Sequence, residues 1–206
     1  MCDPSVNLEY LKTNDIKEAP DHKNVSLTLI ERGIIYFFTR SRVNIENPHS
    51  VNDLQRTYFV LRPIPQDVKL DDGLKKDDGN NRLIALPKKV FPRHHRDKFM
   101  AFVEKGKATI NDLKEGFFPG SEYTTKTRGV QHQPPIMPIA EGVYSITRKD
   151  GSSYLTYILN IPMNIDEVQY DLGLQPKGSF IVSVKNPERP GPPQARLPKG
   201  PELPKE

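Results

Sequence analysis

The stretch Val143–Ile161, VYSITRKDGSSYLTYILNI, decides the fold of this chain. Two runs rich in Tyr, Ile, Thr and Leu, at 143–148 and 154–161, flank the turn sequence Lys149-Asp-Gly-Ser152. β-branched and aromatic residues are enriched in strands. Asp-Gly is a strong hairpin signal, because the turn needs positive φ and glycine adopts it at little cost. The stretch therefore predicts a β-hairpin.

Outward from this hairpin, five further apolar runs predict strands over 33–43, 56–63, 82–86, 98–104 and 179–184. Two short helices are also expected. Thr109 and Gly116 bracket the first, over 110–115. The spacing of Asn164 and Glu167 is that of a capping box, and Gly173 follows as a stop, which predicts the second helix over 165–172. The pattern predicts a mainly β fold, a β-rich α+β chain with two short helices.

Two parts of the chain carry similar strand patterns. Residues 35–40 (IYFFTR) match 143–148 (VYSITR), and 57–60 (TYFV) match 156–159 (TYIL). These matches indicate an internal repeat, with copies over 31–92 and 140–186. We expect two similar three-stranded units that form a sandwich or a partly closed barrel, which would remove exposed sheet edges. The alternative is a chance match, since Tyr and Thr are common in strands.

The domain organisation follows from composition. Proline accounts for 20 of the 206 residues, and the apolar fraction is 35%. Residues 26–186 are expected to form a single β-rich domain, preceded by an irregular N-terminal arm over 1–25. The tail over 187–206 is rich in Pro and Gly and is expected to be disordered, because it cannot bury enough apolar surface to offset the entropy of ordering. Its P-x-x-P spacings could bind an aromatic groove, although the flanking Arg and Lys are not placed as in the usual SH3 ligands. The alternative is an inert tail.

The sequence also indicates a compartment. The single cysteine, Cys2, excludes an internal disulfide and a multi-cysteine zinc site. The chain starts without a secretory signal, and no run of about 18 apolar residues predicts a membrane-spanning helix. We therefore expect a nuclear or cytoplasmic protein with no membrane contact.

Positive charge is concentrated in the middle of the chain. The formal net charge is +4, but residues 82–131 contain eleven Lys/Arg against five Asp/Glu. Such asymmetry favours polyanionic partners. The expected contact residues, for nucleic acid or an acidic partner, are Lys88, Lys89, Arg93, His94, His95, Arg96, Lys98, Lys126, Arg128 and His132. Gly129 and Pro134-Pro135 predict a firmly shaped turn beside the last of them. The alternative is a solvent-facing connection whose long side chains cover the edge of the core.

No catalytic motif, metal-ligand spacing or phosphate-binding glycine loop occurs in the sequence. We therefore expect a non-enzymatic interaction module without cofactor or metal, which binds a protein or nucleic acid and whose oligomeric state is open. The alternative is a small-molecule-binding or enzymatic β-barrel of unknown substrate. Its pocket would lie between the two units and be lined by residues at matching places, namely Tyr36, Arg40, Tyr58, Tyr144, Arg148 and Tyr157.

Several long strings carry a family resemblance: GIIYFFTRSRV, VNDLQRTYFVLRPIP, RLIALPKKVFPRHHRDKFMAFVEK, YTTKTRGVQHQPP, AEGVYSIT and GSFIVSVKNPERPGPP. Over about residues 30–206 the chain resembles a group of mainly fungal proteins that often carry the name "BTB domain transcription factor". A BTB domain is a helical cluster flanked by a small sheet, and the sequence shows no such segment. The resemblance implies a transcription-related role in the nucleus and assigns no catalytic residue.

Overall fold

The computed structural model describes residues 27–65, 68, 77–86, 88–93 and 101–182. The expected arm over 1–25 and tail over 187–206 lie outside the described residues. The elements are strands β1 (Thr28–Ser41), β2 (Leu54–Ile64), β3 (Asn81–Leu86), β4 (Phe102–Ala108), β5 (Ser121–Thr125), β6 (Gly129–Gln133), β7 (Ile136–Lys149), β8 (Ser152–Ile161) and β9 (Lys177–Val182), and helices η1 (Val51–Asp53), α2 (Ile110–Gly116) and α3 (Glu167–Asp171).

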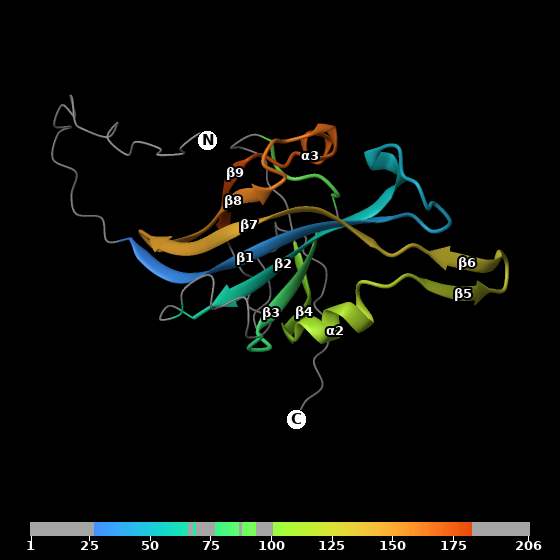
Figure 1. Ribbon diagram of the computed structural model, residues 1–206, viewed down its shortest axis with the longest axis horizontal. Coiled ribbons are helices and arrows are strands. Elements are labelled where there is room, and N and C mark those ends of the chain that lie inside the picture. The colour runs from blue at the N-terminus through green and yellow to red at the C-terminus, as the bar shows by residue number, and fades with distance from the viewer. Residues whose placement is uncertain (1–26, 66–67, 69–76, 87, 94–100, 183–206) are drawn as a thin grey trace, which may run out of the picture.

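Seven of the strands form one antiparallel sheet in the order β4-β3-β2-β1-β7-β8-β9 (Figure 1). The long strands β1 and β7 lie at its centre and pair along most of their length. The sheet is open, with β4 and β9 as its edges, and it does not close into a barrel. Strands β5 and β6 form a separate two-stranded hairpin. The predicted mainly β fold with two short α-helices is thus confirmed.

The strands of the two expected units do form consecutive antiparallel groups, β1-β2-β3 and β7-β8-β9. The groups are joined through β1 and β7, where Tyr36 pairs with Glu141 and Gly33 pairs with Tyr144. Because paired residues in an antiparallel ladder share a face, Tyr36 and Tyr144 lie on opposite faces of the sheet. The matching positions therefore do not share a face, and the internal repeat stays a prediction.

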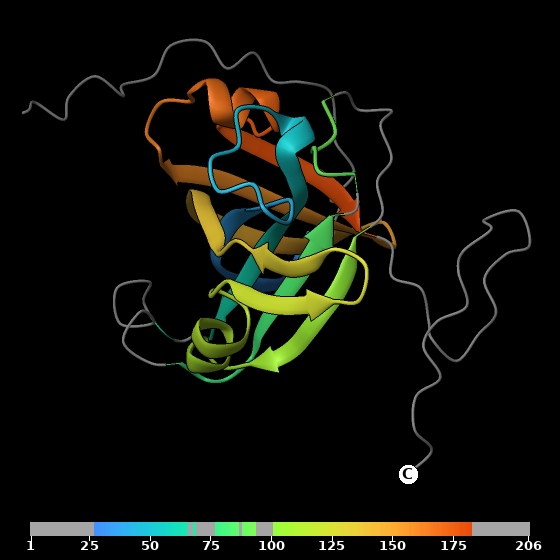
Figure 2. The same cartoon turned by 90° about the vertical axis from the view of Figure 1, so that its right-hand side faces the viewer.

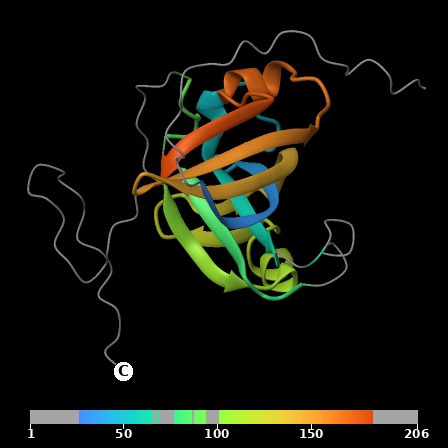
Figure 3. The same cartoon turned by 90° about the vertical axis from the view of Figure 1, so that its left-hand side faces the viewer.

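The inner face of the sheet carries the larger core. Figures 2 and 3 show that the sheet is strongly bent, so that β8 and β9 run across the direction of β2, β3 and β4. Aromatic side chains from both halves meet on this face: the ring of Phe37 lies 5.3 Å from that of Tyr157 and 5.4 Å from that of Phe91. Phe91 and Leu174 come from connecting segments, are almost completely buried and complete this core.

The outer face is covered over β1, β2 and β3. Leu113 of α2 packs there with Phe38, Tyr58 and other buried residues, together with Phe117 and Phe118. The helix begins at Thr109, as predicted. Its hydroxyl accepts a hydrogen bond from the Asp112 amide at 3.0 Å, and the Asp112 carboxylate accepts one from the Thr109 amide at 2.8 Å. This capping box lets a seven-residue helix begin cleanly beside the sheet.

The predicted turn at Asp150-Gly151 and the predicted stop at Gly173 are confirmed, whereas the start of the second helix is shifted. Asp150 and Gly151 have φ values of 48° and 79°, as a type I′ hairpin turn requires. Gly173 ends the segment after α3 with φ of 73°. The helix itself begins later than predicted, because its N-cap is Asp166, whose carboxylate accepts a hydrogen bond from the Glu167 amide at 2.7 Å.

The middle of the chain differs most from expectation. The strand predicted at 98–104 lies at Phe102–Ala108, and residues 94–100 are outside the described part. Residues 123–132, for which the sequence predicted no strand, belong to the β5–β6 hairpin. This hairpin has mostly polar strands and covers no core, so it lacks the apolar alternation by which strands are recognised in a sequence.

Burial of tyrosine hydroxyls predicts how stability depends on pH. Burial raises the pKa above its ordinary value of 10.0 for Tyr36, Tyr58, Tyr144 and Tyr157. At Tyr144, a hydrogen bond to the Glu31 carboxylate at 2.6 Å raises the pKa further. Above pH 10 the unfolded chain releases these protons while the folded chain keeps them, so unfolding releases up to about four protons and stability falls as pH rises.

Lys89 has the opposite effect on the pH dependence of stability, because burial lowers its pKa. Its folded form loses the proton first, so unfolding takes up at most one proton at this residue. We therefore expect the free energy of unfolding to fall above pH 10 with a limiting slope of about three to four protons. Urea unfolding between pH 8.5 and 11 measures this slope. Tyr144→Phe should reduce it by about one proton, whereas Tyr123→Phe, at an exposed position, should leave it unchanged. A flat profile above pH 10 would contradict the expectation.

Candidate nucleic-acid interface

The β5–β6 hairpin projects beyond the seven-stranded sheet (Figure 1). Its strands pair from Ser121↔Gln133 to Thr125↔Gly129. The turn is fixed by the Thr125 hydroxyl, which accepts a hydrogen bond from the Arg128 amide at 3.1 Å, and by Gly129 with φ of 68°. The sequence predicted a shaped turn from Gly129 and Pro134-Pro135. The structure places the turn at residues 126–128, directly before Gly129, at the tip of a ribbon.

Polar contacts hold the base of the hairpin. The Asn44 amide donates to the His132 carbonyl at 2.8 Å, and the His132 amide donates to the Asn44 side chain at 2.8 Å. The next residue of β6, Gln133, donates through its side chain to the Ser41 carbonyl at 3.3 Å and to the Gln55 side chain at 3.1 Å. These hydrogen bonds connect the ribbon to the ends of β1 and β2, so its base is fixed relative to the sheet.

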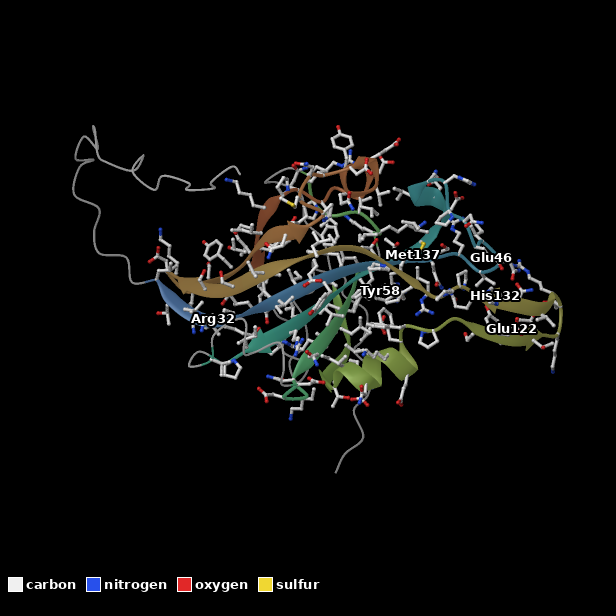
Figure 4. All side chains as sticks on the ribbon, viewed as in Figure 1. Arg32, Glu46, Tyr58, Glu122, His132 and Met137 are labelled. Carbon is white, nitrogen blue, oxygen red and sulfur yellow. The ribbon has the colours of Figure 1, made fainter. Side chains whose placement is uncertain are left out.

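The positive charge of the hairpin is concentrated at its tip, and its acidic residue lies at the base. Lys126 and Arg128 are both exposed, and residues 123–132 contain no Asp or Glu. The acid of the hairpin, Glu122, lies at its base, where its carboxylate is 3.5 Å from the His132 imidazole. Figure 4 shows His132 between Glu122 and Glu46. His132 also lines an open groove of about 490 Å³ with residues 44–47. Of the three predicted hairpin residues, Lys126 and Arg128 are thus available at the tip, whereas His132 is at the base.

In the other predicted cluster, at 88–98, Arg93 makes contacts that stabilise the fold. The Arg93 guanidinium donates to the carbonyls of Tyr170 and Asp171 at 3.1 and 2.8 Å and lies 5.4 Å from the centre of the Tyr170 ring. It thus binds the last turn of α3, where a cation is favoured by the exposed carbonyls. His94, His95, Arg96 and Lys98 lie outside the described residues.

Lys89 is also held close to the sheet. The Thr57 hydroxyl donates to its carbonyl, and its backbone adopts a φ of 66°. Its ammonium lies 3.5 Å from the carbonyls of Val51 and Asn52. Burial lowers the pKa of Lys89, and the nearby Arg42 lowers it further. Lys88 is exposed.

The two predicted clusters contact the same connecting loop at different places. The loop at 42–53 binds the hairpin through Asn44 and approaches Lys89 through Val51 and Asn52. Lys89 and Arg93 thus contact backbone carbonyls of the fold, whereas Lys126 and Arg128 are exposed at the hairpin tip.

The six residues predicted to line a pocket are divided by the sheet. Tyr36 and Tyr58 lie on the outer face, whereas Tyr144 and Tyr157 belong to the inner core. Arg148 is exposed at the far end of β7. Tyr144 and Tyr157 are paired across β7 and β8 within the inner core. Arg40 and Tyr58 share a groove of about 310 Å³ on the outer face. The six residues therefore do not line one common pocket.

That outer groove includes residues that the sequence did not single out. Gln55, Arg56, Glu104, Phe117 and Gln133 line it with Arg40 and Tyr58. These five residues come from β2, β4, β6 and the segment after α2. Arg40 and Arg56 are directly paired across β1 and β2. Only the pairing register reveals this neighbourhood, because the two arginines are sixteen positions apart in the sequence.

Neither a family model, nor a curated protein, nor a solved structure matches this chain. In the described part of the chain, no helix has the length and apolar character needed to cross a membrane. The same residues contain no group of three or more His, Cys, Asp or Glu arranged to hold a metal ion.

Proposed function

We propose that this protein is a non-enzymatic interaction module that binds nucleic acid through its projecting β5–β6 hairpin. One observation carries the proposal: a two-stranded ribbon extends from the sheet with two exposed cations at its tip and no acid among residues 123–132. Phosphate neutralisation by Lys and Arg supplies most of the affinity of non-specific nucleic-acid binding. The tip offers such groups where no carboxylate competes for them.

The dimensions of the ribbon favour duplex DNA. At about 3.4 Å per residue, a five-residue strand is about 17 Å long. The major groove of B-DNA is about 12 Å wide and admits a two-stranded β-ribbon. Thr124 and Thr127 supply hydroxyl groups next to the two cations, and hydroxyls are common donors to phosphate oxygens. The proposed complex therefore places the tip in the groove and its flanks against the backbone.

A role in the nucleus belongs to the same proposal. The resemblance to proteins named "BTB domain transcription factor" supports it independently of the hairpin. An acidic protein surface is the second class of partner that two exposed cations would suit, and the binding experiment separates it from DNA.

We expect full-length protein to bind a fluorescent DNA duplex with an affinity that falls as salt is raised. If Lys126 and Arg128 each neutralise one phosphate, Lys126→Ala/Arg128→Ala should lower the slope of log K against log salt by about 1.8. Fluorescence anisotropy between 50 and 200 mM NaCl measures both slopes.

The matched control is Arg148→Ala/Lys149→Ala, which removes the same charge from the exposed β7–β8 turn at the opposite end of the sheet (Figure 1). This variant should keep the wild-type slope to within the effect of general charge. No binding at 50 mM NaCl, or equal losses in both double variants, would rule out the hairpin as the contact. Pull-down by an acidic polypeptide, with no binding to DNA, would assign the surface to a protein partner.

A further inference from the structure

The outer groove contains two arginines that face each other across neighbouring strands. Arg40 of β1 pairs directly with Arg56 of β2, and both line the groove. Like charges directly opposite each other in an antiparallel pair are destabilising. A negative charge between or beside the two guanidinium groups would reduce this repulsion.

The protein supplies only part of that negative charge. Arg56 forms an ion pair with Glu104 at 2.8 Å. Arg40 instead donates to the carbonyls of Phe117 and Pro119, and its guanidinium lies 5.3 Å from the centre of the Phe117 ring. Among the described residues, no carboxylate pairs with Arg40, and its buried Nε has no hydrogen-bond partner. The groove therefore carries a net positive charge.

The remaining polar groups of the groove are suited to an oxyanion. Tyr58 contributes a hydroxyl group near both arginines. Burial raises the pKa of this hydroxyl despite the opposing effect of Arg56 and Arg40, so it remains a donor at neutral pH. Burial likewise lowers the pKa of Arg40, because its positive charge is partly removed from water. Gln133 lies at the rim, next to the base of the hairpin.

We propose that this outer groove is a phosphate-binding site in which Arg40, Arg56 and the Tyr58 hydroxyl hold the phosphate oxygens. Guanidinium groups bind phosphate through paired, charge-assisted hydrogen bonds. The two guanidinium groups and the neutral Tyr58 hydroxyl together offer several hydrogen-bond donors. One phosphate group has several oxygens that can accept from them. The site goes beyond the hairpin contact proposed above, because it uses other residues on another surface of the chain.

The phosphate has two chemical sources that share this recognition. It belongs either to a small phosphorylated molecule or to the backbone of a nucleic acid that also contacts the hairpin. The position of Gln133 at both the groove and the hairpin base makes the second source geometrically accessible. Two arms of one experiment distinguish these sources.

The first arm titrates ¹⁵N-labelled full-length protein with inorganic phosphate at constant ionic strength, with chloride as the reference anion. Saturable shifts are expected at the amides around Arg40, Arg56 and Tyr58. Arg56→Gln should weaken this binding about tenfold or more, because it removes a charge-assisted hydrogen bond. Arg148→Gln, at an exposed position away from the groove, is the matched control and should leave the titration unchanged.

The second arm repeats the DNA salt titration with Arg56→Gln. A slope lowered by about 0.9 would identify a backbone phosphate as the occupant, and an unchanged slope with an impaired phosphate titration would identify a small phosphorylated ligand. Either result supports the site. Identical behaviour of Arg56→Gln, Arg148→Gln and wild type in both arms would overturn it, whatever the hairpin variants show. The amide spectrum of each variant checks that it is folded.

Discussion

Phe91→Ala is expected to lower the free energy of unfolding by about 3–5 kcal/mol, the range for removing a large buried aromatic side chain. Phe91 is only 2% exposed. Its ring contacts those of Phe37, Phe59 and Phe180 and so connects β1, β2 and β9 across the inner face.

Urea denaturation with a matched phenylalanine substitution measures this effect. Phe102→Ala removes the same atoms from the edge strand β4, where the side chain is 43% exposed, and should cost less than about 1.5 kcal/mol. A loss below about 1 kcal/mol for Phe91→Ala would show that residues 88–93 are not anchored in the core. Residues 88–93 would then form a surface loop without packing contacts to the inner core.

Gly33→Ala is the second substitution with a large expected effect, a loss of about 3 kcal/mol or more. An added Cβ would lie 2.0 Å from the carbonyl oxygen of Arg62 and 2.8 Å from the ring of Tyr144. The first of these contacts is with backbone, so it is relieved only if β1 and β2 move apart. Overpacking that forces side-chain and backbone shifts costs about 1–3 kcal/mol and occasionally more, and the 2.0 Å approach to a backbone atom places this substitution at the upper end.

Gly106→Ala is the control for this prediction. Gly106 lies in β4, and an added Cβ there meets no atom within 4 Å. Its substitution should change stability by no more than about 1 kcal/mol. Equal thermal unfolding midpoints for the two variants would show that β1 and β2 do not approach as closely as described.

Local signals in the sequence predicted the local structure well. The Asp150-Gly151 turn, the cap at Thr109 and the stop at Gly173 all depend on residues within a few positions of each other. The backbone preferences and short-range hydrogen bonds that fix them are already encoded in those few residues. The strand after the Asp150-Gly151 turn was predicted to within two residues of β8, whereas the strand before it was predicted over 143–148 and β7 begins seven residues earlier, at Ile136.

Long-range pairing could not be obtained in this way. Which tyrosines share a face depends on the register between β1 and β7, where Gly33 rather than Tyr36 pairs with Tyr144. A shift of one residue moves a side chain to the other face of a sheet. Matching strings in the sequence therefore placed Tyr36 and Tyr144 together, whereas the structure separates them.

The candidate interface was predicted in part. Charge alone singled out Lys126 and Arg128, because the middle of the chain is basic. Charge could not distinguish them from Arg93, whose guanidinium binds the end of α3. The difference between a free cation and a structural one depends on contacts with residues more than seventy positions away, and these contacts follow from the fold.

Binding at the hairpin is tested most directly by mapping amide shifts while a DNA duplex is added to labelled full-length protein at 50 mM NaCl. We expect the largest shifts at residues 124–130, at the tip of β5 and β6, and we expect them to diminish at 200 mM NaCl. Shifts confined to other surfaces, or a spectrum that DNA leaves unchanged at the lower salt concentration, would contradict this expectation.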